Sequence, residues 1–260
     1  MTGRAPYEPY EGPPTGPEMG DDSTVFIKIC GITCAEDALL ATALGADALG
    51  FIFAPSRRQV SERVVRDIVG QLPPDVMTVG VFRNTGRARV VETVNRIGLR
   101  AAQLHGDESP ATTKWVADRV PVTIRALPAG SPDVDRFDEF GADLLLLDAP
   151  IPGAGKVFDW AMADGPSSIR PMLLAGGLTP DNVGEAIERV DPYGVDVASG
   201  VEAAPGRKDP RLLRAFMTNA RAARPTRVEG YRGDPTNRPF DWQQDEAGPT
   251  GEADRGTDRP

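Results

Sequence analysis

Residues 171–200 read PMLLAGGLTPDNVGEAIERVDPYGVDVASG. An apolar run opens this stretch, an amphipathic pattern covers 179–190, and a second apolar run begins at Gly194. Apolar runs with few charges are typical of parallel strands that are buried on both faces. Thr179 followed by Pro180 is a typical helix start, with a capping residue before a proline at the first helical position. The stretch therefore predicts a strand–helix–strand unit.

The same alternation continues through the rest of residues 25–224. The expected strands are Val25–Cys30, Ala48–Phe53, Val76–Phe82, Ala101–His105, Val122–Leu127, Asp143–Asp148, Pro171–Gly176 and Gly194–Ser199. Amphipathic stretches at 34–44, 61–71, 87–97 and 179–190, with a short one at 158–163, indicate helices between them. Eight such units in about 200 residues is the count for a closed parallel barrel. We therefore expect an α/β protein, a single (β/α)8 TIM barrel. An open doubly wound sheet is disfavoured because no G-x-G-x-x-G follows the first strand.

The two ends of the chain differ in composition from this unit. Residues 1–24 are rich in proline and glycine, and residues 225–260 are rich in glycine, proline and charged residues. Neither end has a periodic apolar pattern that could bury enough surface to offset the entropy of ordering. We expect both to be disordered tails.

Composition excludes several function classes. The net charge of −9 offers no basic face for a nucleic-acid partner. No apolar run approaches the roughly 20 residues that span a membrane, and the first residues lack the apolar stretch of a secretory signal, which predicts a cytoplasmic protein. One histidine and two cysteines spaced C-x3-C fit no usual metal site. We expect neither metal nor cofactor.

Active residues of a (β/α)8 barrel lie at the carboxyl ends of its strands. Side chains alternate along a strand, so Lys28 and Cys30 share one face while the apolar Ile27 and Ile29 share the other. The apolar pair suits the outer layer, which turns Lys28 and Cys30 into the barrel. A lysine beside a thiol favours the thiolate, the form needed for base or nucleophilic work. The alternative is a small buried cysteine that only fills space.

Asp148 ends the apolar run 144–147. A carboxylate that closes a buried strand is costly unless it is paired or used, so it is either a catalytic group or part of a cap or ion pair. A thiol and a carboxylic acid that face each other across a barrel mouth can supply a base and an acid. Cys30 and Asp148 are therefore the candidate catalytic pair.

Two glycine clusters follow the last two expected strands, at the loops that bind phosphate in many barrels. Gly176 and Gly177 follow one strand, and Ser199 and Gly200 follow the other. Glycines allow backbone N–H groups close to phosphate oxygens, Ser199 adds a hydroxyl donor, and a short helix after Gly200 would add its N-terminus. Plain turn glycines are the alternative, and the paired placement favours a phosphate site.

Four further residues are candidates for substrate binding. Arg58 follows the second strand, where its guanidinium could grip a carboxylate with two hydrogen bonds, although it could equally be a solvated loop charge. His105 could orient a substrate, but a hydrogen bond inside the barrel is the simpler interpretation. Asp196 is expected to point inward as an acceptor, and Lys28 completes the set.

Several motifs appear in the order known from one family. They are KICGIT (28–33), EDA (36–38), GAD (45–47), GFIF (50–53), QLHG (103–106), FDW (158–160), LAGGL (174–178), DVASGVE (196–202) and GRKD (206–209). Together they resemble phosphoribosylanthranilate isomerases from about residue 26 to residue 220.

The resemblance implies a cofactor-independent aldose–ketose isomerisation in tryptophan biosynthesis. N-(5′-phosphoribosyl)anthranilate would become 1-(o-carboxyphenylamino)-1-deoxyribulose 5-phosphate. By similarity Asp148 is the general acid, Cys30 the general base, and Arg58 the partner of the anthranilate carboxylate, with the glycine loops on the phosphate. A small-molecule phosphosugar is then the expected partner of a monomer or homodimer. A non-catalytic phosphosugar-binding barrel and a related isomerase of a specialised pathway remain alternatives.

Overall fold

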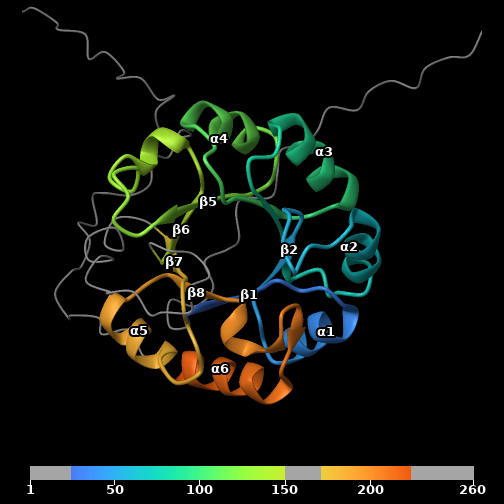
Figure 1. Ribbon diagram of the computed structural model, residues 1–260, viewed down its shortest axis with the longest axis vertical. Helices are drawn as coiled ribbons and strands as arrows, with labels where there is room; N and C mark the ends of the chain where they lie inside the picture. The colour runs from blue at the N-terminus through green and yellow to red at the C-terminus, as the bar shows by residue number, and fades with distance from the viewer. Residues whose placement is uncertain (1–24, 150–170, 224–260) are drawn as a thin grey trace, which may run out of the picture. The chain divides into compact units, whose positions relative to one another are not determined.

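A closed barrel of eight parallel strands forms the centre of the protein. The computed structural model describes residues 25–149 and 171–223. Each strand is hydrogen-bonded to the next, and β8 pairs with β1 to close the barrel (Figure 1). The strands are β1 (Phe26–Cys30), β2 (Ala48–Ile52), β3 (Met77–Phe82), β4 (Ala101–Leu104), β5 (Thr123–Pro128), β6 (Leu144–Asp148), β7 (Met172–Leu174) and β8 (Gly194–Val197). The predicted (β/α)8 barrel is confirmed.

Helices surround the strands on the outside, as Figure 1 shows. They are α1 (Ala35–Ala43), α2 (Glu62–Val69), α3 (Arg87–Ile97), α4 (Pro110–Ala117), α5 (Val183–Val190) and α6 (Pro210–Ala222), with the 3-10 turn η1 (Phe137–Phe140) after β5. The expected helix at 158–163 and both expected tails lie outside the described residues. Within the described residues no helix is long and apolar enough to cross a membrane.

The core has two layers, as the alternation of side chains in β1 predicted. Ile27 and Ile29 are fully buried in the outer layer, between the strands and the helices. A separate inner cluster fills the barrel, with Val79, Ile124 and Leu146 among its members. Lys28 points into this inner space and is also fully buried. The inner layer therefore holds a charge that needs a partner.

Two helix starts test the capping predictions. Ser61 caps α2, since its hydroxyl accepts a hydrogen bond from the Val64 N–H at 3.4 Å. The predicted start at Thr179 is wrong, because α5 begins only at Val183. Asn182 forms the preceding turn by accepting the Thr179 N–H at 2.7 Å and donating to the Gly177 carbonyl at 3.1 Å.

The segment after β8 also differs from expectation. Residues Ser199–Val201 form a single 3-10 turn, η4, which already includes Gly200. The chain then continues as an antiparallel hairpin of β9 (Glu202–Ala204) and β10 (Arg207–Lys208). The expected short helix after Gly200 is therefore wrong, and this hairpin stands in its place.

Candidate active site

A pocket of about 190 Å³ opens at the carboxyl ends of the strands. Its lining includes the predicted residues Cys30, Arg58, His105, Asp148, Gly176, Gly177, Asp196 and Ser199, together with Gln103. Residues from the first and the last strand of the barrel meet here because the barrel closes between β1 and β8. Of the predicted set, Lys28 and Gly200 do not line the pocket.

Lys28 lies below the pocket and is neutralised by an ion pair. Its Nζ donates to Asp196 Oδ1 at 2.7 Å, so Asp196 is the inward acceptor that the sequence predicted. Burial disfavours the lysine cation, but Asp196 and the neighbouring Cys30 outweigh it and raise the pKa of Lys28. The charged and fully buried Lys28 is therefore held in place by its partner.

Cys30 stands above this pair, almost fully buried. Burial raises the pKa of the thiol, the charge of Lys28 lowers it, and the charge of Asp196 raises it again. The net direction is upward. Lys28 does favour the thiolate, as expected, but burial of the thiol and the charge of Asp196 outweigh it, so the pKa of Cys30 is raised in the free site.

Asp148 faces the pocket from the end of β6. Its Oδ1 accepts the Ala149 N–H at 2.8 Å, and its Oδ2 lies 3.2 Å from His105 Nε2. The other ring nitrogen, Nδ1, lies 3.0 Å from Gln103 Nε2. The preferred interpretation of His105 as a hydrogen-bonding group inside the barrel is confirmed. Gln103, His105 and Asp148 thus form one chain of polar contacts from β4 to β6.

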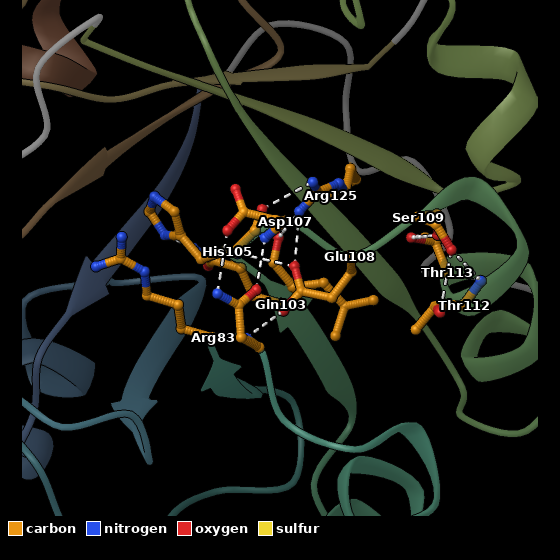
Figure 2. A network of polar contacts seen from close by, with 12 residues as sticks. Arg83, Gln103, His105, Asp107, Glu108, Ser109, Thr112, Thr113 and Arg125 are labelled. Carbon is orange, nitrogen blue, oxygen red and sulfur yellow. Dashed lines mark hydrogen bonds and ion pairs between the residues drawn. The ribbon is translucent and has the colours of Figure 1, made fainter.

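A buried ion pair that the sequence did not predict supports this chain. Arg125 from β5 donates to Glu108 Oε2 at 2.9 Å and to the Leu104 carbonyl at 3.0 Å. Glu108 also accepts the backbone N–H groups of Asn84 and Gly106, at 2.7 and 2.8 Å. Figure 2 shows Arg125 and Glu108 beside His105. Because Glu108 binds the loops after β3 and β4 together, the pair fixes the backbone next to His105.

The glycine loops approach each other closely. Gly176 has a φ of +88°, and a Cβ there would lie 2.5 Å from the Ala149 backbone nitrogen, so only glycine fits. A Cβ on Gly200 would lie 1.9 Å from the Leu178 carbonyl oxygen. Gly200 therefore packs the loop after β8 against the loop after β7. Gly177 and Ser199 line the pocket beside Gly176.

Arg58 is held by a carboxylate of the protein itself. Its Nε and Nη2 donate to Glu202 on the β9–β10 hairpin, at 2.8 and 2.7 Å. Lys208 of the same hairpin donates to Glu202, to the Cys30 carbonyl and to the Ala198 carbonyl. Sequence reasoning assigned no role to Glu202 or Lys208. The signal was present, because Glu202 belongs to the DVASGVE motif and Lys208 to the GRKD motif.

The mouth continues beyond Asp148 and His105 into a second, wider cavity of about 710 Å³. Arg83, Ser109 and Asp133 are among its lining residues. Asp148 and His105 line both cavities, so they stand where the two spaces meet. Among the described residues no three metal-binding side chains cluster together.

Comparisons with known proteins agree on one family. A family model described as N-(5′-phosphoribosyl)anthranilate (PRA) isomerase matches residues 27–219. A relative named N-(5′-phosphoribosyl)anthranilate isomerase from Pelobacter propionicus is 44% identical over 213 residues, which cover 80% of this chain and 100% of the relative.

Solved structures are similar as well. One is a phosphoribosyl anthranilate isomerase in complex with reduced 1-(o-carboxyphenylamino)-1-deoxyribulose 5-phosphate, with a TM-score of 0.69 and 40% identity over 76% of this chain and 98% of that one. Another comprises monomers of the dimeric phosphoribosylanthranilate isomerase from Thermotoga maritima, with a TM-score of 0.69 and 38% identity over the same shares of the two chains.

Proposed function

Since the chain belongs to the phosphoribosylanthranilate isomerase family and isomerises N-(5′-phosphoribosyl)anthranilate in tryptophan biosynthesis, we propose that Cys30 and Asp148 perform the two proton transfers of that reaction. One observation carries this assignment. The thiol and the carboxyl group line the same pocket at the carboxyl ends of β1 and β6, next to the glycine loops after β7 and β8.

Asp148 is the proposed general acid. It gives a proton to the ribose ring oxygen as the bond from that oxygen to C1′ breaks, and the lone pair of the anthranilate nitrogen forms a C1′=N bond. The resulting Schiff base is a cation. The contacts of Asp148 with the Ala149 N–H and His105 Nε2 support this role, because they fix the direction in which the carboxyl group points.

Cys30 is the proposed general base. Burial keeps the pKa of its thiol above the ordinary value, so the free site holds mostly thiol. The cationic Schiff base that forms beside it favours the thiolate, because an opposite charge within a few ångströms stabilises the ionised form. As the thiolate forms, the thiol proton passes to solvent. The thiolate then removes the C2′ proton, and the electron pair of that C–H bond forms the C1′=C2′ bond of an enaminol while the C1′=N electron pair returns to nitrogen. The enaminol becomes the C2′ ketone as its C2′ hydroxyl proton passes to solvent and C1′ takes up the proton held by Cys30.

Among the remaining candidates, the glycine loops and Arg58 are proposed to bind the two ends of the substrate. The backbone of Gly176, Gly177 and Gly200 and the hydroxyl of Ser199 are proposed to hold the phosphate, since backbone N–H groups in such turns suit anions. Arg58 is proposed to hold the anthranilate carboxylate by charge-assisted hydrogen bonds. Lys28, Asp196 and His105 keep Cys30 and Asp148 in position, and only His105 and Asp196 line the space that substrate would fill.

Further properties follow from this assignment. The reaction needs no cofactor, because the chain itself supplies the acid and the base. Its partner is a small phosphosugar in the cytoplasm, and nucleic acid is not expected for a chain with a net charge of −9. A monomer or a homodimer is proposed, and the dimeric relative from Thermotoga maritima is consistent with the second.

A fluorescence assay that follows the loss of phosphoribosylanthranilate tests the function. Cys30→Ala and Asp148→Asn should each lower kcat by about 10²–10⁴-fold, the usual contribution of a positioned acid or base. Both variants should still bind the reduced product analogue. Retention of more than about a tenth of the wild-type kcat by either variant would remove that residue from its role. Binding without turnover in the wild type would favour the phosphosugar-binding alternative.

A further inference from the structure

The β9–β10 hairpin brings a buried carboxylate to the arginine of the site. We propose that Glu202 is a positioning residue that holds one edge of the Arg58 guanidinium and presents the other edge to the substrate. It thereby sets the selectivity of the site for a substrate with a carboxylate. The proposal rests on the proposed function, in which Arg58 binds the anthranilate carboxylate.

Glu202 occupies only one of the two forks of Arg58. Its Oε1 accepts from Nε at 2.8 Å and its Oε2 accepts from Nη2 at 2.7 Å, which is the side-on fork of a guanidinium. Within the described part of the chain, Nη1 has no acceptor. The end-on fork, formed by Nη1 and the second N–H of Nη2, is therefore available to another carboxylate. Arg58 lines the pocket next to Cys30, where the substrate is proposed to bind.

The stem of Arg58 is fixed as well. A Cβ on Gly31, which follows Cys30, would lie only 2.7 Å from Arg58 Cδ. The stem therefore lies against the backbone of Gly31, whose φ of +75° also favours glycine. An arginine that is held along its stem and by one fork loses little side-chain entropy when it binds a ligand.

Lys208 holds the carboxylate of Glu202 in place. Glu202 accepts from Lys208 Nζ at 3.2 Å and from the Gly206 N–H at 3.3 Å. Lys208 Nζ also donates to the carbonyls of Cys30 and Ala198, at 2.7 and 3.0 Å. The lysine thus ties the hairpin to the ends of β1 and β8, and its side chain is completely buried.

The charges of this group suit one additional anion. Burial opposes ionisation of Glu202, yet hydrogen bonds and charges from Arg58 and Lys208 outweigh it and lower the pKa of the carboxyl group. Two cations and one anion leave a net charge of +1 on the group. A single substrate carboxylate on the free fork of Arg58 would neutralise it. Without Glu202, Arg58 would lose its orientation and face the buried Lys208 cation unshielded.

The test compares two ligands in the full-length protein. One is the reduced 1-(o-carboxyphenylamino)-1-deoxyribulose 5-phosphate, and the other is the same molecule without the carboxylate. Titration calorimetry gives Kd for both in the wild type, Glu202→Gln, Arg58→Ala and the double variant. We expect the wild type to prefer the carboxylated ligand by at least about tenfold, since the lost contact is charge-assisted.

Glu202→Gln should reduce this preference at least about fivefold and leave Kd for the ligand without carboxylate unchanged. In the Arg58→Ala background, Glu202→Gln should not change the preference further, because the guanidinium that Glu202 orients is already absent. With the natural substrate, KM should rise while kcat stays within about threefold of wild type. Glu62→Gln is the matched control, since Glu62 pairs with Arg89 and Arg96 on the outer helices and not in the site. It should change neither Kd.

The outcomes separate this proposal from the proposed function. If Arg58→Ala keeps the preference, Arg58 is not the carboxylate partner, and both the assignment and the proposal fall. If Arg58→Ala loses the preference while Glu202→Gln keeps it, or weakens both ligands equally, only the positioning role is overturned. Should Glu202→Gln fail to fold, Glu202→Asp applies the same criterion, because it keeps the charge but withdraws it from Arg58.

Discussion

Replacing Gly50 with alanine should displace the thiol of Cys30. Gly50 on β2 is the register partner of Cys30 on β1, and both face the inside of the barrel. A Cβ on Gly50 would lie 2.8 Å from Cys30 Sγ, 3.1 Å from Lys28 Nζ and 3.2 Å from Cys30 Cα. The strand backbones are held by their hydrogen bonds, so the thiol must move.

The size of the effect follows from these distances. The sulfur has to retreat by about half an ångström or more to reach ordinary van der Waals contact. Overpacking of this kind costs about 1–3 kcal/mol in the free energy of unfolding. Misplacing a reacting group by about 1 Å can cost about 10²-fold in rate, so we expect kcat to fall by roughly tenfold or more. Urea denaturation and the phosphoribosylanthranilate fluorescence assay measure the two effects.

Gly184→Ala is the matched control. Gly184 lies within α5, and no atom stands within 4 Å of the position its Cβ would take. Alanine there should stabilise the protein by about 0.5–1 kcal/mol through helix propensity and leave kcat unchanged. If Gly50→Ala keeps kcat within about twofold of wild type, the thiol either has room to move or need not stay in place, and the reasoning is refuted.

Three further predictions concern the buried charges and the helix cap. In a Cys34→Ser background, alkylation of Cys30 should follow thiolate formation with a midpoint above pH 9.0, because burial raises the pKa of this thiol. Mass spectrometry of the alkylated protein across the alkaline range measures this midpoint. A midpoint near neutral pH would contradict the prediction. Lys28→Met should cost up to about 3–5 kcal/mol in the free energy of unfolding by leaving Asp196, whose side chain is only 10% exposed, without its partner. The Lys28→Met/Asp196→Asn double variant should recover part of that loss in urea denaturation. If the double variant loses as much stability as Lys28→Met alone, the two charges are not coupled. Ser61→Ala should cost about 1 kcal/mol by removing the α2 cap, with kcat unaffected; a fall in kcat would mean that the helix start influences the site.

Local patterns predicted the elements well but not all of their ends. Every expected strand exists, and β1, β2, β3, β4 and β6 each differ from the expected range by one residue at one end. β7 is shorter than expected because the chain leaves the strand before Gly176, where a positive φ turns the loop. The start of α5 was misplaced because the side chain of Asn182, rather than Thr179, forms the turn before the helix. Such a choice depends on one hydrogen bond and has no periodic signal.

The sequence by itself determined the barrel and the residue types at its mouth, because strand alternation and the order of strands are local properties. That was enough to place Cys30 and Asp148 at strand ends. Only the tertiary structure decided which charges neutralise one another. Lys28 and Asp196 are 168 residues apart, and Arg58 and Glu202 are 144 apart. Whether a charge is paired depends on distances of a few ångströms after the barrel has closed. For a buried charged side chain, the presence or absence of a partner affects stability more than the type of residue does. Burial inside the closed barrel, together with the charge of Asp196, raises the pKa of the Cys30 thiol, which is the opposite of the effect of its neighbour Lys28 alone.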